Sequence, residues 1–279
     1  EDATTTAKLE AAGMVLLGKL STHEFARGGP TDALPFPNAK NPWNTAYFAG
    51  GSSSGSGVAV AAGMVGLAMG SDTAGSIRLP ATFCGIVGLK PTYGVISRRG
   101  VVPLSFTLDH AGPLTRSVED CALAMQVLAG HDPGDPGSAH EAVPDYSANL
   151  RKGVAGLTIG RARAYDEEAG VNAEVMAALD AAAAQWQTLG ARIIDVKLPS
   201  KRRMDAATQT ILLAEGFAIH GEWLRTRPQD YGRVTRERLM MGAFVSGADY
   251  VQAQRLRRML TAEVDAALAG CDAILCAGN

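Results

Sequence analysis

The sequence predicts an α/β fold, with one domain centred on a β-sheet that has helices on both faces. Two observations carry this prediction: a strand–helix–strand pattern at residues 157–196, and an amphipathic helix at residues 118–129. With 279 residues, 47% hydrophobic and 19% charged, the chain has the composition of a globular protein with a large core. No repeat or clear linker divides the sequence. Residues 1–279 are therefore predicted to form a single domain.

The first elements follow from local pattern. Residues 2–12 predict a helix capped by Asp2 and closed by Gly13, and the apolar run MVLLG that follows predicts a buried strand. Residues 28–57 are rich in Gly, Pro, Asn and Ser, which predicts loops.

The next stretch alternates small and apolar residues over 58–70, which predicts a tightly packed helix followed by a strand. Residues 118–129 carry acidic side chains in the first turn of the predicted helix, where the helix dipole favours them. Residues 131–148 hold several Pro, Gly and Asp and predict a surface connection.

The second half opens with the best structural signal, in which LTIG and ARIIDV are strands on either side of an amphipathic helix that ends at Gly190. Such a unit implies parallel strands joined by a right-handed crossover. Further helices are predicted at 204–226, 233–245 and 247–269. The run DAILC near the end predicts one more strand.

Charge and cysteine usage exclude several classes of protein. The 26 basic and 28 acidic residues are spread along the chain, so no basic stripe predicts nucleic-acid binding and no polybasic tract predicts a membrane surface. The five histidines lack metal-ligand spacing, and the four cysteines form no CxxC pair, so we expect reduced thiols and no metal or other cofactor. The expected location is cytoplasmic, although a signal peptide ahead of residue 1 is compatible with the sequence.

The most informative segment is 50–91, in which GGSSSGSG is followed by GSDTAGSIRLPATFCGIVGLKP. A flexible linker is a poor reading because apolar sequence of core quality flanks the glycines. A phosphate loop fails because GxxxxGK[ST] is absent. A nucleophile elbow centred on Ser53 fits GxSxG, but a Gly/Ser-rich string matches that pattern by accident and no hydrophobic strand precedes it.

These blocks, together with LDHAGPLTRSVED at 108–120, resemble the amidase-signature family in its general bacterial form. The distinctive part of the resemblance covers about residues 50–120. It implies a mixed central β-sheet flanked by helices on both faces, incomplete here at both ends. It also assigns Ser76 as the nucleophile and Ser52, on a cis peptide bond, as its proton relay.

Further roles come from the same resemblance. The oxyanion hole would be formed by four backbone amides, those of Thr73, Ala74, Gly75 and Ser76. The site would be supported by three side chains, those of Ser53, Asp72 and Arg78. A serine hydroxyl is a weak nucleophile that requires a base within reach, so we expect the Ser52 and Ser76 hydroxyls to lie ~3 Å apart.

The base of this family is a neutral lysine, and it lies ahead of the segment matched by residues 1–26. No lysine of this sequence stands in that context. We therefore expect this chain to be an internal portion of a longer enzyme, with the catalytic lysine outside residues 1–279.

The function expected from these residues is hydrolysis of a linear amide C–N bond through an acyl-enzyme, on a small-molecule substrate. Esters and carbamates are open alternatives, as is the amidase subunit of a tRNA-dependent amidotransferase. An inactive homologue that serves as a binding or scaffold module is the non-enzymatic alternative. A homodimer is allowed, whereas direct contact with nucleic acid or membrane is not expected.

Overall fold

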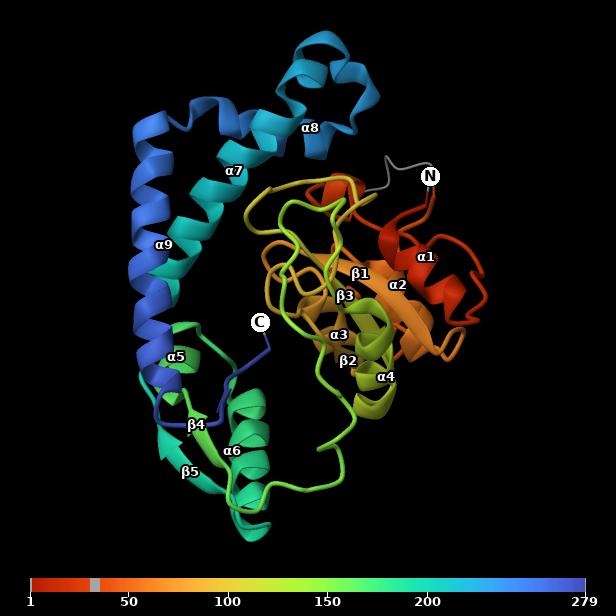
Figure 1. Cartoon of the computed structure of the whole chain (residues 1–279). Helices are drawn as coiled ribbons and strands as arrows, with labels where there is room; N and C mark the ends of the chain where they lie inside the picture. The colour runs from red at the N-terminus through yellow and green to blue at the C-terminus, as the bar shows by residue number, and fades with distance from the viewer. Residues whose placement is uncertain (1, 31–35, 279) are drawn as a thin grey trace. The chain divides into compact units, whose positions relative to one another are not determined.

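The computed structural model describes residues 2–30 and 36–278, and these form two compact units (Figure 1). Unit 1 comprises residues 2–148 and 212–244, and unit 2 comprises 149–211 and 245–278. Each unit contains a small sheet with helices, so the fold is α/β as predicted, but the strands divide between two sheets instead of sharing one central sheet. The assignment of the whole chain to one domain stays a prediction.

The sheet of unit 1 is antiparallel, with strand order β1-β3-β2. Strand β1 (Leu67–Asp72) pairs along its whole length with β3 (His110–Thr115), so that Asp72 lies opposite His110. The short β2 (Val87–Gly88) pairs with the other edge of β3. This register brings the end of β1 and the start of β3 together at the same end of the sheet.

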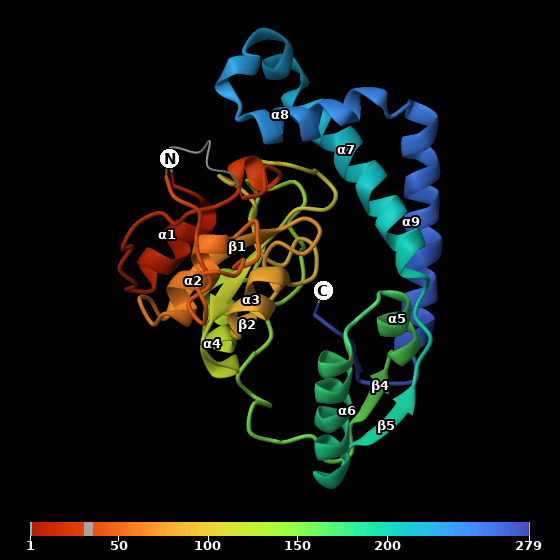
Figure 2. The same cartoon turned by 180° about the vertical axis from the view of Figure 1, so that it is seen from behind.

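Helices cover both faces of this sheet (Figures 1 and 2). Because successive strand residues point to opposite faces, Leu67 and Met69 pack with α4 (Val118–Leu128), whereas Ala68 packs with α2 (Ser54–Ala61) and α3 (Arg78–Cys84). The helix predicted at 118–129 is confirmed as α4, and the helix followed by a strand predicted at 58–70 is confirmed as α2 and β1. Helix α2 starts earlier than predicted. It begins at Ser54, within the segment predicted as a loop; residues 31–35 of that segment lie outside the described residues.

Two predictions for the first twenty residues are wrong. Helix α1 (Thr4–Ala11) has Ala3 at its N-cap and no side-chain cap, so Asp2 does not cap it. The run MVLLG is not a buried strand: Val15, Leu16 and Leu17 are exposed. No strand among the described residues pairs with this run, and a strand cannot form without a neighbour to accept its backbone hydrogen bonds.

The sheet of unit 2 is parallel, with strand order β5-β4-β6. Strands β4 (Thr158–Arg161) and β5 (Arg192–Asp195) are joined through α5 (Arg163–Glu168) and α6 (Ala173–Thr188), which confirms the predicted strand–helix–strand unit. The strand predicted in DAILC is β6 (Ala273–Leu275), parallel to β4.

The predicted helical stretches of the second half are confirmed as α7 (Lys201–Thr226), α8 (Arg233–Met240) with the 3₁₀ turn Met241–Phe244, and α9 (Gly247–Leu268). In unit 1, Leu212 and Leu224 of α7 form a buried cluster with Leu104, Tyr231 and Leu239. Within residues 2–30 and 36–278, every helix is too short or too polar to cross a bilayer.

Candidate active site

The two motif blocks of the sequence meet at the end of β1. The Ser53 hydroxyl donates to the Ser71 carbonyl and accepts from the Ser71 amide, both at 3.2 Å. The Ser53 amide donates to the Ser76 carbonyl at 3.2 Å. Ser53 therefore fixes the start of α2 to β1 and to the turn that follows, which places Ser52 next to the segment that carries Ser76.

Ser52 lies on the cis peptide bond Gly51–Ser52, as the resemblance implied. Its carbonyl accepts hydrogen bonds from the His23 amide at 3.0 Å and from the Thr22 hydroxyl at 2.8 Å. Its hydroxyl is buried and has no hydrogen-bond partner among the described residues. The predicted hydrogen bond between the Ser52 and Ser76 hydroxyls is therefore not formed in this structure; the hydrogen bond that joins the two segments runs instead from the Ser53 amide to the Ser76 carbonyl.

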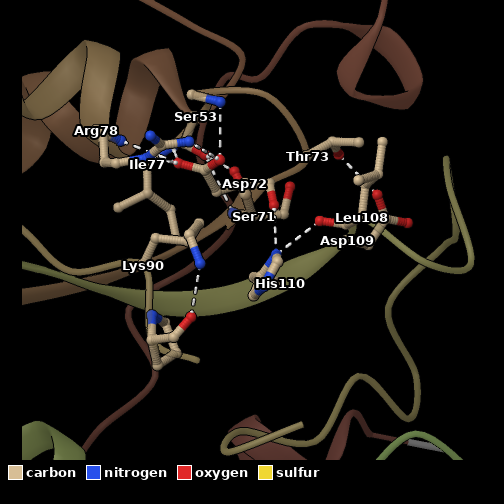
Figure 3. Close-up of polar contacts among 12 residues, drawn as sticks. Ser53, Ser71, Asp72, Thr73, Ile77, Arg78, Lys90, Leu108, Asp109 and His110 are labelled. Carbon is tan, nitrogen blue, oxygen red and sulfur yellow. Dashed lines mark hydrogen bonds and ion pairs between the residues drawn. The ribbon is translucent and has the colours of Figure 1, made fainter. Parts of the chain in front are cut away.

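Asp72 organises the turn between β1 and α3 (Figure 3). Its fully buried carboxylate accepts from the amides of Gly75 (2.7 Å) and Ile77 (3.1 Å) and from the Arg78 guanidinium (3.0 and 2.9 Å). Burial by itself would raise the pKa of Asp72, but the hydrogen bonds and charge of Arg78 and the two amides outweigh it and hold the pKa below its usual value. Asp72 and Arg78 thus brace the turn, as expected for supporting residues.

The turn presents only part of the amide set that the sequence predicted for an oxyanion hole. The Gly75 amide already donates to Asp72, while the amides of Thr73, Ala74 and Ser76 donate to no acceptor among the described residues. Gly75 has φ of 127°, a conformation that favours glycine, whereas Ala74 keeps a negative φ. Ser76 itself is partly exposed.

Thr73, the first residue of the turn, is held from the other side. Its hydroxyl donates to Asp109 at 2.6 Å, and Asp109 accepts in turn from the amides of Leu104 (2.7 Å) and Ser105 (2.8 Å). Asp109 is buried and lies directly before β3, so it links the turn to the loop that precedes that strand (Figure 3).

Two further titratable groups lie beside Asp72 in Figure 3. Burial, with the charge of Arg78, lowers the pKa of Lys90, and its ammonium donates to the Pro91 carbonyl at 2.8 Å. Burial, with the charge of Lys90, lowers the pKa of His110, whose Nδ1 lies 2.6 Å from the Leu108 carbonyl and 3.2 Å from the Asp72 carbonyl. Both side chains are tied to the main chain around the turn.

His23 is the residue that sequence reasoning missed at this site. Its ring covers Gly51 so closely that a Cβ there would lie 2.1 Å from Cε1, so any larger residue before Ser52 would displace the His23 ring. Burial and the nearby charge of Arg238 lower the pKa of His23 to about 4, so the ring is neutral at ordinary pH. The only sequence signal is its position in STHEFA, a segment that the resemblance covered without a role for His23.

An apolar hollow lies beside His23. The His23 ring stacks on Phe48 with centroids 6.0 Å apart, and Phe48 lines a recess of about 370 Å³. The residues that line this recess are mostly aromatic and come from two short segments: Asn41, Trp43, Asn44, Tyr47, Phe48 and Phe83. The recess therefore offers an apolar surface one residue layer away from the Gly51–Ser52 bond.

An α/β fold with a glycine-rich turn, braced by a buried carboxylate and carrying a partly exposed serine, is the arrangement that the motifs implied. Comparison with known proteins gives the same answer, because the family model described as Amidase matches residues 1–278. The chain belongs to the amidase family.

Individual relatives agree with this assignment. The chain is 41% identical, over 297 residues, to a glutamyl-tRNA(Gln) amidotransferase subunit from Pelobacter propionicus. A solved structure described as a vestigial protein complex that reveals the evolutionary origins of an s-triazine catabolic enzyme is 42% identical, with a TM-score of 0.89 and coverage of 97% of this chain and 58% of that one. A peptide amidase in complex with chymostatin is 33% identical, with a TM-score of 0.85 and coverage of 98% and 63%.

The matched part is nearly all of this chain but not all of the relatives. The alignment with the Pelobacter protein spans 98% of this chain and 61% of the relative. The relatives are therefore substantially longer than these 279 residues.

Proposed function

We propose that this chain carries the nucleophile and proton-relay serines of an enzyme that hydrolyses a linear amide C–N bond through an acyl-enzyme at Ser76. The observation that supports the proposal best is the turn itself. A buried carboxylate fixes its backbone, Ser76 is partly exposed, and the amides of Thr73, Ala74 and Ser76 have no acceptor among the described residues.

The chemistry proceeds in two halves. The Ser76 oxygen attacks the substrate carbonyl carbon, and its proton passes to Ser52, whose own proton passes to a base. The negative charge on the carbonyl oxygen is stabilised by the amides of Ala74 and Ser76; losing one such donor typically costs ~3 kcal/mol of transition-state stabilisation. The C–N bond then breaks as the amine leaves with a proton, and water cleaves the acyl–Ser76 ester by the reverse proton path.

The role proposed for Ser52 rests on its unpartnered hydroxyl. Buried hydroxyl groups are rarely left without a hydrogen bond, and each exception calls for an explanation. A base that reaches the Ser52 hydroxyl would supply the partner that the described residues do not. We propose a lysine outside residues 1–279 as that base, kept neutral by burial, which lowers a lysine pKa.

A serine-directed fluorophosphonate probe tests this proposal in the protein as it is naturally expressed. Ser76→Ala should abolish labelling and lower kcat at least ~10⁴-fold, while Ser52→Ala should lower kcat strongly and leave a residue of activity. Ser117→Ala, at the N-cap of α4, is the matched control and should label normally. If Ser53→Ala were more damaging than Ser76→Ala, the nucleophile would be Ser53. If the unmodified protein failed to label, it would be an inactive homologue.

A second candidate function is supported by the 41% identity to an amidotransferase subunit. In that case the enzyme would release ammonia from glutamine for a partner protein. Glutaminase activity and co-purification of a partner would favour this function, whereas turnover of aryl amides, esters or carbamates by the isolated protein would favour a stand-alone amidase. A homodimer and a cytoplasmic location stay predictions.

A further inference from the structure

Loop 104–109 connects the candidate oxyanion turn to helix α7. On the turn side, Asp109 accepts from the Thr73 hydroxyl at 2.6 Å and from the amides of Leu104 and Ser105 at 2.7 and 2.8 Å. This carboxylate therefore fixes the turn and one end of the loop in a single arrangement.

The other side of the loop is fixed by Glu215, in the part of α7 that belongs to unit 1. Its carboxylate accepts a hydrogen bond from the Ser105 hydroxyl, and it accepts from the Thr107 amide at 3.0 Å and the Thr107 hydroxyl at 2.8 Å. Glu215 is only 5% exposed and Ser105 is fully buried.

Ser105 joins the two carboxylates, because its amide donates to Asp109 and its hydroxyl donates to Glu215. The result is a continuous chain of hydrogen bonds from α7 through the loop to Thr73. Burying a carboxylate is costly unless it is well hydrogen-bonded, and a carboxylate so bonded holds its donors in one geometry.

We propose that Glu215 is a positioning residue for the oxyanion turn, acting through Ser105, Asp109 and Thr73. This inference rests on the proposed function, because it assumes that the turn after β1 stabilises the reacting carbonyl. Amide donors must be held within about 0.5 Å of the position from which they hydrogen-bond to the reacting oxygen. Misplacement by 1 Å can cost ~100-fold in rate. The hydrogen bonds of Glu215 keep the loop, and through it Thr73, from shifting.

The test is steady-state kinetics of Glu215→Gln and Thr73→Val, alone and combined, in the protein as it is naturally expressed. Glu215→Gln should lower kcat about 10- to 100-fold and change KM less than about twofold. Because both changes act on one chain of hydrogen bonds, the double variant should be little worse than the more damaging single variant. Thr73→Ser, which keeps the hydroxyl, should restore most of the kcat lost in Thr73→Val.

The matched control is Asp132→Asn, which removes another buried carboxylate of unit 1 that accepts from two hydroxyl groups, of Ser97 and Thr4, both at 2.6 Å. It should lower thermal stability as Glu215→Gln does but leave kcat unchanged. If Glu215→Gln lowers kcat no more than Asp132→Asn, or if the losses in the double variant multiply, the proposal is overturned.

Two further measurements keep the result unambiguous. If Glu215→Gln does not fold, Ser105→Ala, which removes one hydroxyl from the same chain, should lower kcat with KM retained; unchanged kcat there would also overturn the proposal. The serine probe separates this inference from the proposed function. An inactive Ser76→Ala with normal Glu215→Gln contradicts only the positioning role, whereas an active Ser76→Ala contradicts the proposed function itself.

Discussion

The two units each contain a strand that ends in a buried charged residue of an ion pair, but the buried strand-end charge is negative in unit 1 and positive in unit 2. In unit 1, β1 ends at the buried carboxylate of Asp72, which pairs with Arg78 at the start of α3. In unit 2, β4 ends at the buried guanidinium of Arg161, which pairs with Asp166 in α5. Both are strand-to-helix connections, but residues 73–77 separate β1 from α3, whereas only Ala162 separates β4 from α5.

The difference in polarity determines what each turn can do. A carboxylate accepts hydrogen bonds, so Asp72 can orient the amides of Gly75 and Ile77 toward itself and shape the backbone around Ser76. A guanidinium only donates, so Arg161 cannot orient backbone amides and instead contacts Asp166 and Asp180. In this chain, the ion pair at the candidate site is thus the one whose carboxylate accepts hydrogen bonds from amides of the turn that carries Ser76.

The largest expected effect comes from removing the charge of the carboxylate in unit 1. Asp72→Asn keeps the size of the side chain but leaves the Arg78 pair broken and places an amide donor against the turn amides. Arg78 is half-exposed and its charge can be hydrated in the variant, but the Gly75 and Ile77 amides lose their buried acceptor, and leaving a buried group unsatisfied costs about 1–3 kcal/mol of the free energy of unfolding. We expect that loss together with a fall in kcat of ~100-fold or more, measured by thermal unfolding and steady-state kinetics. Retained kcat would show that Asp72 does not shape the reactive turn.

The corresponding change in unit 2 should separate stability from activity. Arg161→Leu leaves Asp166 buried without its charged partner, so the free energy of unfolding should fall by ~3–5 kcal/mol while kcat at a permissive temperature stays within about twofold. The control is Arg203→Ala, which removes a half-exposed pair with Glu263 and should change stability by less than ~1 kcal/mol. A kcat loss in Arg161→Leu as large as that in Asp72→Asn would remove the contrast between the two ion pairs.

The smallest effect concerns pH and again distinguishes the units, because all five histidines lie in unit 1. The pKa of His23 is lowered from 6.5 to about 4, so between these values the unfolded chain binds more protons than the folded chain. The stability that His23 contributes is therefore complete above pH 6.5 and is lost as the pH falls toward 4.

Hydrogen exchange as a function of pH measures this difference. Protection of the β3 amides should fall between pH 6.5 and 4, while protection of the β4 amides should change little. His23→Gln, which cannot titrate, should reduce the loss in β3, although His110 and His220, whose pKa values burial also lowers, should keep part of it. An equal loss in both units would mean that the histidines are not its source.

The sequence by itself determined those features that depend on neighbouring residues. Periodicity predicted helices at 118–129 and 247–269 and the parallel strand–helix–strand unit of residues 157–196, because side-chain spacing along a helix or strand is set by local geometry. The family resemblance carried by the motif blocks implied the cis bond before Ser52 and supporting roles for Asp72 and Arg78, which lie six residues apart and meet within one turn.

The tertiary structure decided everything that depends on which distant segments meet. The apolar run MVLLG looked like a buried strand, but pairing requires a partner that its own residues do not specify. The closeness of His23 to Gly51 and the contact of Glu215 with Ser105 join positions 28 and 110 residues apart. Even within the motif, the Gly75 amide donates to Asp72 only because of the backbone path of the turn. A motif specifies which donors are present, whereas the folded chain decides which of them already have an acceptor.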